Sequence, residues 1–280
     1  MDLTTMPLQT PLRISVSSWA LHSLIGQTYP GRPEDPDADF IAPHAGTLDL
    51  LDVPAALAAC GITTMEVCHF HLPAHDTAYL DQFKSALTAA NVELWNLLID
   101  DGDIAHPLHG ARDAGWVLRW MDVAGHLGAR CVRVIAGKQE PTPGVIAHSS
   151  ERLMGLMVDA YLRGLHVMTE NWYQTASRPG PIEKIIGMSN GTLGLCLDFG
   201  NWGGDTKYAD YAAIAPFATS CHAKCNFSGG KPDADDFRRC LLILRDARYQ
   251  GPFTLVHGES GAVWESLETQ QDLLREFLDT

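Results

Sequence analysis

The 280-residue sequence predicts an α/β protein built as a single (β/α)8 barrel, also called a TIM barrel. Two observations favour this fold: short β-branched apolar segments alternate with longer segments of helical periodicity, and the alternation repeats eight times. A third disfavours a doubly wound open sheet, because no Gly-x-Gly-x-x-Gly motif follows the first strand. Since no linker or low-complexity tract interrupts the pattern, residues 1–280 are expected to form one domain, with residues 1–12 as an N-terminal extension.

The expected strands share an apolar composition and end in polar residues. A loop-like segment, residues 26–46, follows the first of them and is expected to cover the carboxyl-terminal rim of the barrel as a lid or substrate loop. The strands are residues 13–19, 62–70, 92–99, 131–137, 165–171, 192–198, 218–224 and 252–259.

The segments between the strands carry apolar residues at helical spacing. Asp76 is placed to cap the first long helix, and Gly61, Gly128 and Gly164 stand where a helix ends in a left-handed residue before the next strand. The clearest helical stripes are residues 79–90, 116–127, 153–162 and 263–277, and shorter helices fit residues 47–60, 181–190, 207–215 and 234–247.

Composition and charge exclude several classes of function. The formal net charge of −14 disfavours binding to nucleic acid or to an anionic membrane and suits a small neutral or metal-chelated substrate. The seven cysteines are widely spaced and form no Cys-x-x-Cys motif, which favours reduced thiols and a cytoplasmic location. The first 15 residues show no signal-peptide pattern, and no apolar run is long enough to span a membrane.

Four consecutive late strands end in strong metal-ligand side chains. Because the carboxyl ends of barrel strands share one rim, these side chains should converge. Three carboxylates so close together would repel each other and raise each other's pKa, a penalty that a divalent cation removes. Taken singly, each acid is better explained by a bond to a strand-end amide or a neighbouring arginine, but four in register favour a metal site. The four are Glu170, Asp198, His222 and Glu259, at intervals of 28, 24 and 37 residues.

In this order and spacing the four residues resemble the sugar phosphate isomerase/epimerase superfamily, whose members have a xylose-isomerase-like barrel. That group includes ketose 3-epimerases, hydroxypyruvate isomerase, inosose dehydratase and the AP-endonuclease branch. The resemblance extends from "ISVSSW" to "VHGES". It implies that Glu170, Asp198, His222 and Glu259 bind one divalent ion, that Glu170 and Glu259 are the acid/base pair, and that a homo-oligomer, dimer or tetramer, is an option.

This assignment is chemically consistent. An ion chelated by a ketone and a neighbouring hydroxyl polarises the carbonyl and stabilises the enediolate formed when a base removes the adjacent proton. Two glutamates on opposite faces permit epimerisation, and one suffices for aldose–ketose isomerisation. Oxygen-rich ligation with one imidazole favours Mn²⁺ or Mg²⁺, with Co²⁺ or Zn²⁺ as alternatives. The predicted function is therefore a metal-dependent isomerase or epimerase of a small carbohydrate or hydroxy-ketone.

Several further residues are candidates for substrate contact, and each has a structural alternative. Glu66 can bond a sugar hydroxyl or pair with Arg133 in the barrel core. Lys224 can reach a substrate oxygen or form a rim salt bridge. Trp19 can stack on a sugar ring or belong to the core. The full set is Trp19, Glu66, His69, Asn201, Lys224 and His257.

Three other functions remain open. The first is a dehydratase or lyase acting on an inosose or keto-glycoside, with the same metal and proton abstraction. The second is a nuclease of the AP-endonuclease branch, disfavoured because Asn201 stands where that branch and the ketose 3-epimerases have histidine, and because no Asp-x-His follows His222. The third is a non-catalytic barrel that binds a sugar or a partner protein.

Overall fold

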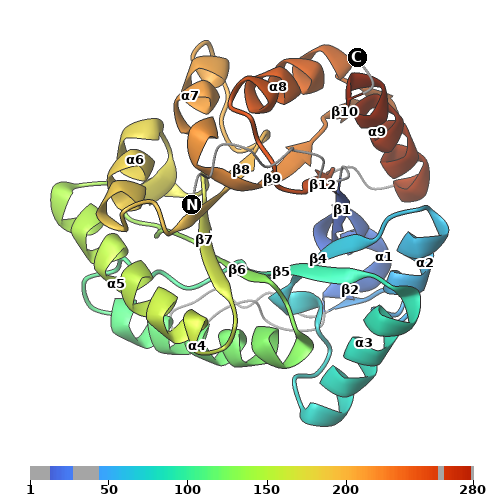
Figure 1. Cartoon of the computed structure of the whole chain (residues 1–280), viewed down its shortest axis with the longest axis horizontal. Coiled ribbons are helices and arrows are strands. Elements are labelled where there is room, and N and C mark those ends of the chain that lie inside the picture. The colour runs from blue at the N-terminus through green and yellow to red at the C-terminus, as the bar shows by residue number, and fades with distance from the viewer. Residues whose placement is uncertain (1–12, 28–43, 258–261, 279–280) are drawn as a thin grey trace, which may run out of the picture.

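The computed structural model describes residues 13–27, 44–257 and 262–278. Eight parallel strands close into a barrel in which neighbours in the wall follow one another along the chain, and helices surround it as an outer ring (Figure 1). This confirms the predicted fold. The strands are β1 (Ile14–Ser17), β4 (Thr64–Cys68), β5 (Glu93–Ile99), β6 (Cys131–Val134), β7 (His166–Glu170), β8 (Gly194–Asp198), β9 (Ala218–Lys224) and β12 (Phe253–Val256).

Each predicted helical segment forms a helix, because its apolar stripe packs on the barrel wall, and local caps fix several of the helix ends. Asp76 accepts the backbone N–H of Tyr79 at 3.0 Å, and Gly128 ends its helix with φ 76°. The helices are α2 (Val53–Ala59), α3 (Thr77–Ala90), α4 (Gly110–Leu127), α5 (Pro143–Tyr161), α6 (Pro179–Met188), α7 (Lys207–Ile214), α8 (Ala234–Asp246) and α9 (Val263–Leu278). None of the helices in the described ranges is long and apolar enough to cross a membrane.

One short helix, short strands and 3-10 turns lie in the connections between the barrel strands and the long helices. The pair β2–β3 brackets residues 28–43, so most of the predicted rim loop at 26–46 lies outside the described residues, as does the predicted extension at 1–12. The short elements are α1 (His22–Ile25), β2 (Gly26–Gln27), β3 (His44–Ala45), β10 (Phe227–Ser228) and β11 (Lys231–Pro232), with 3-10 turns η1 (Ser18–Leu21), η2 (His69–His71), η3 (Gln174–Ala176) and η4 (Ala215–Phe217).

The amino-terminal end of the barrel is filled by side chains. A bulge at Trp95, where the register between β4 and β5 shifts, lets the indole enter the interior. Its Nε1–H donates to Ser220 Oγ at 3.1 Å, and the Arg13 guanidinium lies 4.5 Å from its ring centroid. A ligand therefore has its access at the opposite, carboxyl-terminal end.

Candidate active site

The carboxyl-terminal end of the barrel holds a cavity of about 190 Å³, called here the reaction cavity. Every barrel strand contributes at least one lining residue, as expected if inward-facing side chains at the strand ends build the site. Aromatic and aliphatic groups form much of the wall, and charged groups cluster toward β6–β9. The lining residues are Ser17, Trp19, Cys68, Phe70, Leu98, Asp100, Arg133, Glu170, Trp172, Asp198, Asn201, His222, Lys224 and Val256.

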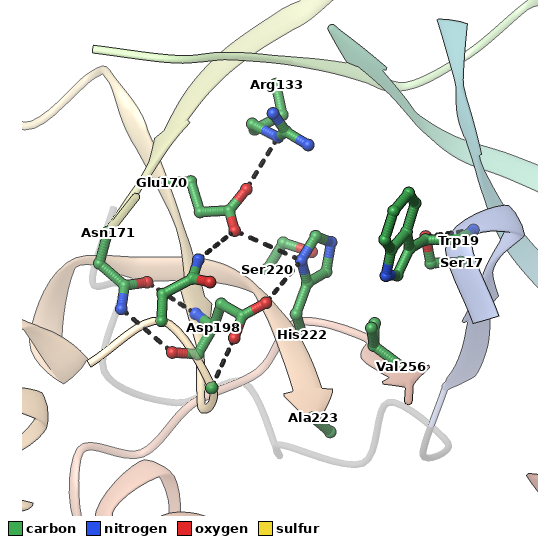
Figure 2. A network of polar contacts seen from close by, with 12 residues as sticks. Ser17, Trp19, Arg133, Glu170, Asn171, Asp198, Ser220, His222, Ala223 and Val256 are labelled. Carbon is green, nitrogen blue, oxygen red and sulfur yellow. Dashed lines mark hydrogen bonds and ion pairs between the residues drawn. The ribbon is translucent and has the colours of Figure 1, made fainter. Parts of the chain in front are cut away.

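Three of the predicted metal ligands meet in this cavity. His222 Nδ1 lies 3.4 Å from Asp198 Oδ2 and 3.7 Å from Glu170 Oε1, and Figure 2 shows both carboxylates turned toward the imidazole. Ligands about 2.1 Å from one octahedral ion lie about 3.0 Å apart when adjacent and about 4.2 Å apart when opposite. Both spacings to Nδ1 fall between these values, so each carboxylate forms with His222 a pair that fits a shared cation. Glu259, the fourth predicted ligand, lies outside the described residues.

Local bonds hold the two carboxylates in place. Arg133 Nε lies 2.9 Å from Glu170 Oε2 (Figure 2), and Asn201 Nδ2 donates to Glu170 Oε1 at 2.7 Å. The backbone N–H of Gly200 donates to Asp198 Oδ1 at 2.6 Å. These contacts fix both carboxylates before any ligand arrives, which is the preorganisation that a metal or catalytic site requires.

Glu66 determines the orientation of His222. Its Oε2 lies 2.8 Å from His222 Nε2 and its Oε1 accepts the hydroxyl of Ser220 at 3.3 Å, so the imidazole offers Nδ1 to the carboxylates. A carboxylate on the far ring nitrogen is the usual outer support of a metal-binding histidine. Glu66 is fully buried and does not line the reaction cavity, and its carboxylate contacts His222 and Ser220 in place of the Arg133 pairing that the sequence suggested.

The charge balance of the site fits a divalent ion. Among the described residues, four carboxylates in or directly beneath the reaction cavity face two permanent cations, a difference of two negative charges. Burial alone would lower the pKa of His222, but the nearby carboxylates outweigh it and raise the pKa well above its usual value. A proton on His222 and a metal ion therefore compete for the same place. The carboxylates are Asp100, Glu170, Asp198 and Glu66, and the cations are Arg133 and Lys224.

Cys196 is a further donor near the cluster. Glu170, Cys196 and His222 each place one ligand atom within 4.8 Å of the others. Burial raises the pKa of the Cys196 thiol to about 12, so the group stays protonated and is a poor ligand for a hard cation. Asp198, whose pKa is lowered because its bonds and nearby positive charges outweigh burial, is the better third ligand.

Replacing Glu66 with glutamine should raise the Kd for Mn²⁺ by ~10–100-fold, because the neutral amide supports the tautomer and basicity of His222 less well. Calorimetric titration of EDTA-treated protein with Mn²⁺ measures the change. Glu93→Gln is the matched control, since Glu93 pairs with Arg13 and Arg130 toward the opposite end of the barrel. Equal Kd values for both variants would show that Glu66 has no influence on the metal site.

Three of the six predicted substrate residues line the reaction cavity. Trp19 is 42 % exposed and meets Phe70 edge-on, with ring centroids 6.0 Å apart. Lys224 lies with its stem across Gly200, where an added Cβ would come within 2.3 Å of Lys224 Cδ, so glycine at 200 makes room for the lysine. Asn201 lines the cavity and donates to Glu170.

The other predicted contacts are directed elsewhere. His69 is fully buried and packs edge-on between Trp116 and Trp120, with centroids 5.2 and 5.0 Å away. His257 packs near Phe227, because the strand alternation turns the preceding Val256 into the cavity instead. Neither histidine lines the reaction cavity, and the same holds for Glu66.

Sequence reasoning missed Arg133 and Asp100 as cavity residues. Arg133 is buried with an ion pair to Asp100 as well as to Glu170. The acidic stretch "IDDGD" that follows β5 is largely buried and paired rather than solvated. Asp101 pairs with Lys138, and Asp103 accepts the backbone N–H of Lys138 at 3.1 Å. The inward alternation of Arg133 with Cys131 was the available signal.

A family model described as a xylose isomerase-like TIM barrel matches residues 54–277. No curated protein is similar enough in sequence to be matched.

Solved structures with the same fold are similar to the chain over nearly its full length. A xylose isomerase-like TIM barrel protein from Mycobacterium smegmatis in complex with magnesium is 15% identical, with TM-score 0.69 and coverage of 97% of this chain and 98% of that one. The probable 3-DHS dehydratase of Bacillus anthracis is 11% identical, with TM-score 0.67 and coverage of 94% and 99%. D-psicose 3-epimerase with D-tagatose from Clostridium cellulolyticum H10 is 11% identical, with TM-score 0.66 and coverage of 96% and 97%.

Proposed function

The chain belongs to the xylose isomerase-like TIM barrel family, and we propose that it is a divalent-metal-dependent isomerase or epimerase of a small carbohydrate or hydroxy-ketone. The observation that carries the proposal is the meeting of Glu170, Asp198 and His222 at the carboxyl end of the barrel, with an excess of negative charge around them. The solved epimerase and the magnesium complex of the same fold are consistent with it.

Glu170, Asp198 and His222 would hold the ion, with Glu259 as the expected fourth ligand. Mn²⁺ or Mg²⁺ suits this set of mainly oxygen donors. When bound, the ion would supply Lewis-acid polarisation of a substrate carbonyl. The protein's part is to keep these donors oriented and shielded from bulk water.

Glu170 is the proposed base. Its carboxylate is fixed by Arg133 and Asn201, so it presents the same face to the cavity in every turnover. It would remove the proton from the carbon next to the carbonyl, and return of a proton to the neighbouring carbon completes an isomerisation. Epimerisation needs a second base on the other face, for which Glu259 remains the candidate.

Lys224 and Trp19 are proposed to bind the substrate. The Lys224 ammonium would donate to a substrate oxygen beside Asp198, and the apolar wall of Trp19 and Phe70 would cover the ring. Oriented donors within a largely apolar enclosure are typical of small-ligand sites.

The proposal predicts metal-dependent exchange of carbon-bound hydrogen. Protein treated with EDTA should bind one equivalent of Mn²⁺, and only the loaded form should exchange a proton next to the carbonyl of one sugar in D₂O. The measurement is proton NMR over a panel of ketoses, inososes and keto-glycosides. Protein that binds no Mn²⁺, or exchange that persists in EDTA, would contradict it. Exchange accompanied by loss of water would identify a dehydratase instead.

A further inference from the structure

We propose that a second subsite adjoins the reaction cavity and binds a neutral hydroxylated ring, so that the ligand is a two-ring glycoside. This rests on the proposed function, which places the reacting carbon at Glu170. The subsite is a groove of about 820 Å³ across the connections that follow β7 and β8, called here the rim groove. It is lined by Lys138, Asn171, Trp172, Tyr173, Gln174, Ser177, Arg178, Asn201, Trp202, Gly203, Thr206 and Asp210.

The rim groove adjoins the reaction cavity. Trp172 and Asn201 line both. Asn201 also donates to Glu170 at 2.7 Å, so the shared boundary lies one side chain from the proposed base. The reaction cavity, at about 190 Å³, is smaller than the ~300–1,000 Å³ usual for ligand sites, whereas the rim groove falls within that range. A substrate held at Glu170 would thus have room to extend in this direction.

Fixed aromatic rings line the rim groove. Trp172 and Tyr173 have ring centroids 4.2 Å apart, and Lys138 Nζ lies 5.1 Å from the Tyr173 centroid. Trp202 stacks on Tyr211 at 5.8 Å and donates its Nε1–H to the carbonyl of Ala176 at 3.2 Å. Rings held in this way give a preformed platform for the faces of a sugar ring.

Tyr173 adopts a backbone conformation that costs free energy. Its φ of 57° and ψ of 178° lie in a region that is essentially restricted to glycine. The turn is held by the backbone N–H of Ala176, which donates to the carbonyl of Tyr173 at 3.2 Å. Such conformations cluster at ligand clamps, and here the strained backbone carries an aromatic side chain into the rim groove.

The polar lining favours a neutral ligand. Amides and hydroxyls at Gln174, Ser177 and Thr206 can exchange hydrogen bonds with sugar hydroxyls. The lining holds two cations, Lys138 and Arg178, but Lys138 is paired with Asp101 and Asp210 adds a carboxylate, so the groove carries no excess of positive charge for a phosphate. Neutral hydroxyl recognition on aromatic platforms is the chemistry of a glycosyl ring.

The test compares a ketose with ketose disaccharides on the Mn²⁺-loaded full chain. D-Fructose is titrated beside lactulose, maltulose, turanose and isomaltulose, which keep the fructose half and vary the linkage to a second ring. We expect at least one disaccharide to bind 10-fold or more tightly than D-fructose by calorimetry. Binding of no disaccharide more than twofold tighter than D-fructose, or of none of the five sugars, overturns the subsite.

Variants locate the gain in affinity. Tyr173→Gly removes the ring at a position whose backbone suits glycine, so the variant should fold, and the ratio of disaccharide to fructose affinity should fall to about one. Tyr161→Ala is the control, because Tyr161 is 82 % exposed on α5 and does not line the groove. If the ratio of disaccharide to fructose affinity is unchanged in Tyr173→Gly, or falls equally in Tyr161→Ala, the second ring does not bind in the rim groove.

The D₂O exchange assay on the same sugars separates this proposal from the proposed function. If D-fructose exchanges its proton but no disaccharide binds more tightly than D-fructose, the proposed function is supported and the subsite is excluded. If a disaccharide binds more tightly than D-fructose, this difference is lost in Tyr173→Gly and no sugar exchanges a proton, the subsite is supported and the proposed function is excluded.

Discussion

Glu170→Gln should lower the metal-dependent exchange rate by ~10³-fold or more, because one substitution removes both a ligand charge and the proposed base. Loss of a general base alone costs ~10²–10⁴-fold. The glutamine keeps the size of the side chain but has no carboxylate to accept a proton. The rate is measured in D₂O at saturating Mn²⁺, so that weaker metal binding does not account for the loss.

A control variant and a separate measurement of metal binding distinguish loss of the base from other effects of the substitution. Glu183→Gln, at an exposed position on α6, makes the same chemical change away from the site and should leave the rate unchanged. The Kd for Mn²⁺ of Glu170→Gln, measured separately, reports its role as a ligand. A rate within threefold of the unmodified protein would exclude Glu170 as the base.

Arg133→Met should lower the free energy of unfolding of the metal-free protein by ~3–5 kcal/mol, because removing one member of a buried ion network leaves the others uncompensated. Asp100 and Glu170 both pair with the guanidinium. Burial alone would lower the pKa of Arg133, but these two carboxylates raise it well above its usual value, so the group remains charged. Urea unfolding in EDTA measures the difference.

The control for this substitution is Arg163→Met. Arg163 pairs with Asp122 at 2.7 Å near the surface, and exposed pairs contribute ~0–1 kcal/mol. If both methionine variants lost less than ~1 kcal/mol, the network around Arg133 would not stabilise the fold.

The fold could be predicted from the sequence because its signals are local and repeated. Apolar periodicity and helix caps such as Asp76 operate within a few residues, and each of the eight repeats supported the same architecture. The position of the candidate site followed from topology, since strand ends in a barrel share one rim. Helix ends were set by local chemistry too, as the left-handed Gly128 shows.

The pairing of charges within the site could not be predicted in the same way. Glu66 and Arg133 both face the interior, and the choice of partner depends on the stagger of the strands around the barrel. Two register shifts, beside Glu66 and beside Cys196, alter that stagger without a clear sequence signature. Glu66 consequently meets His222, and Arg133 meets Asp100 and Glu170.

The contact between Glu66 and His222 joins β4 to β9, which are separated in the barrel wall by β1 and β12. The two strands that close the barrel, β1 from the start of the chain and β12 from its end, therefore lie between the strands that carry Glu66 and His222. If the ion binds the folded protein and not the unfolded chain, a free ion concentration 100 times the Kd would add about 2.7 kcal/mol to the free energy of unfolding. The free concentration of the divalent ion in the cell would then affect the stability of the protein as well as its rate of turnover.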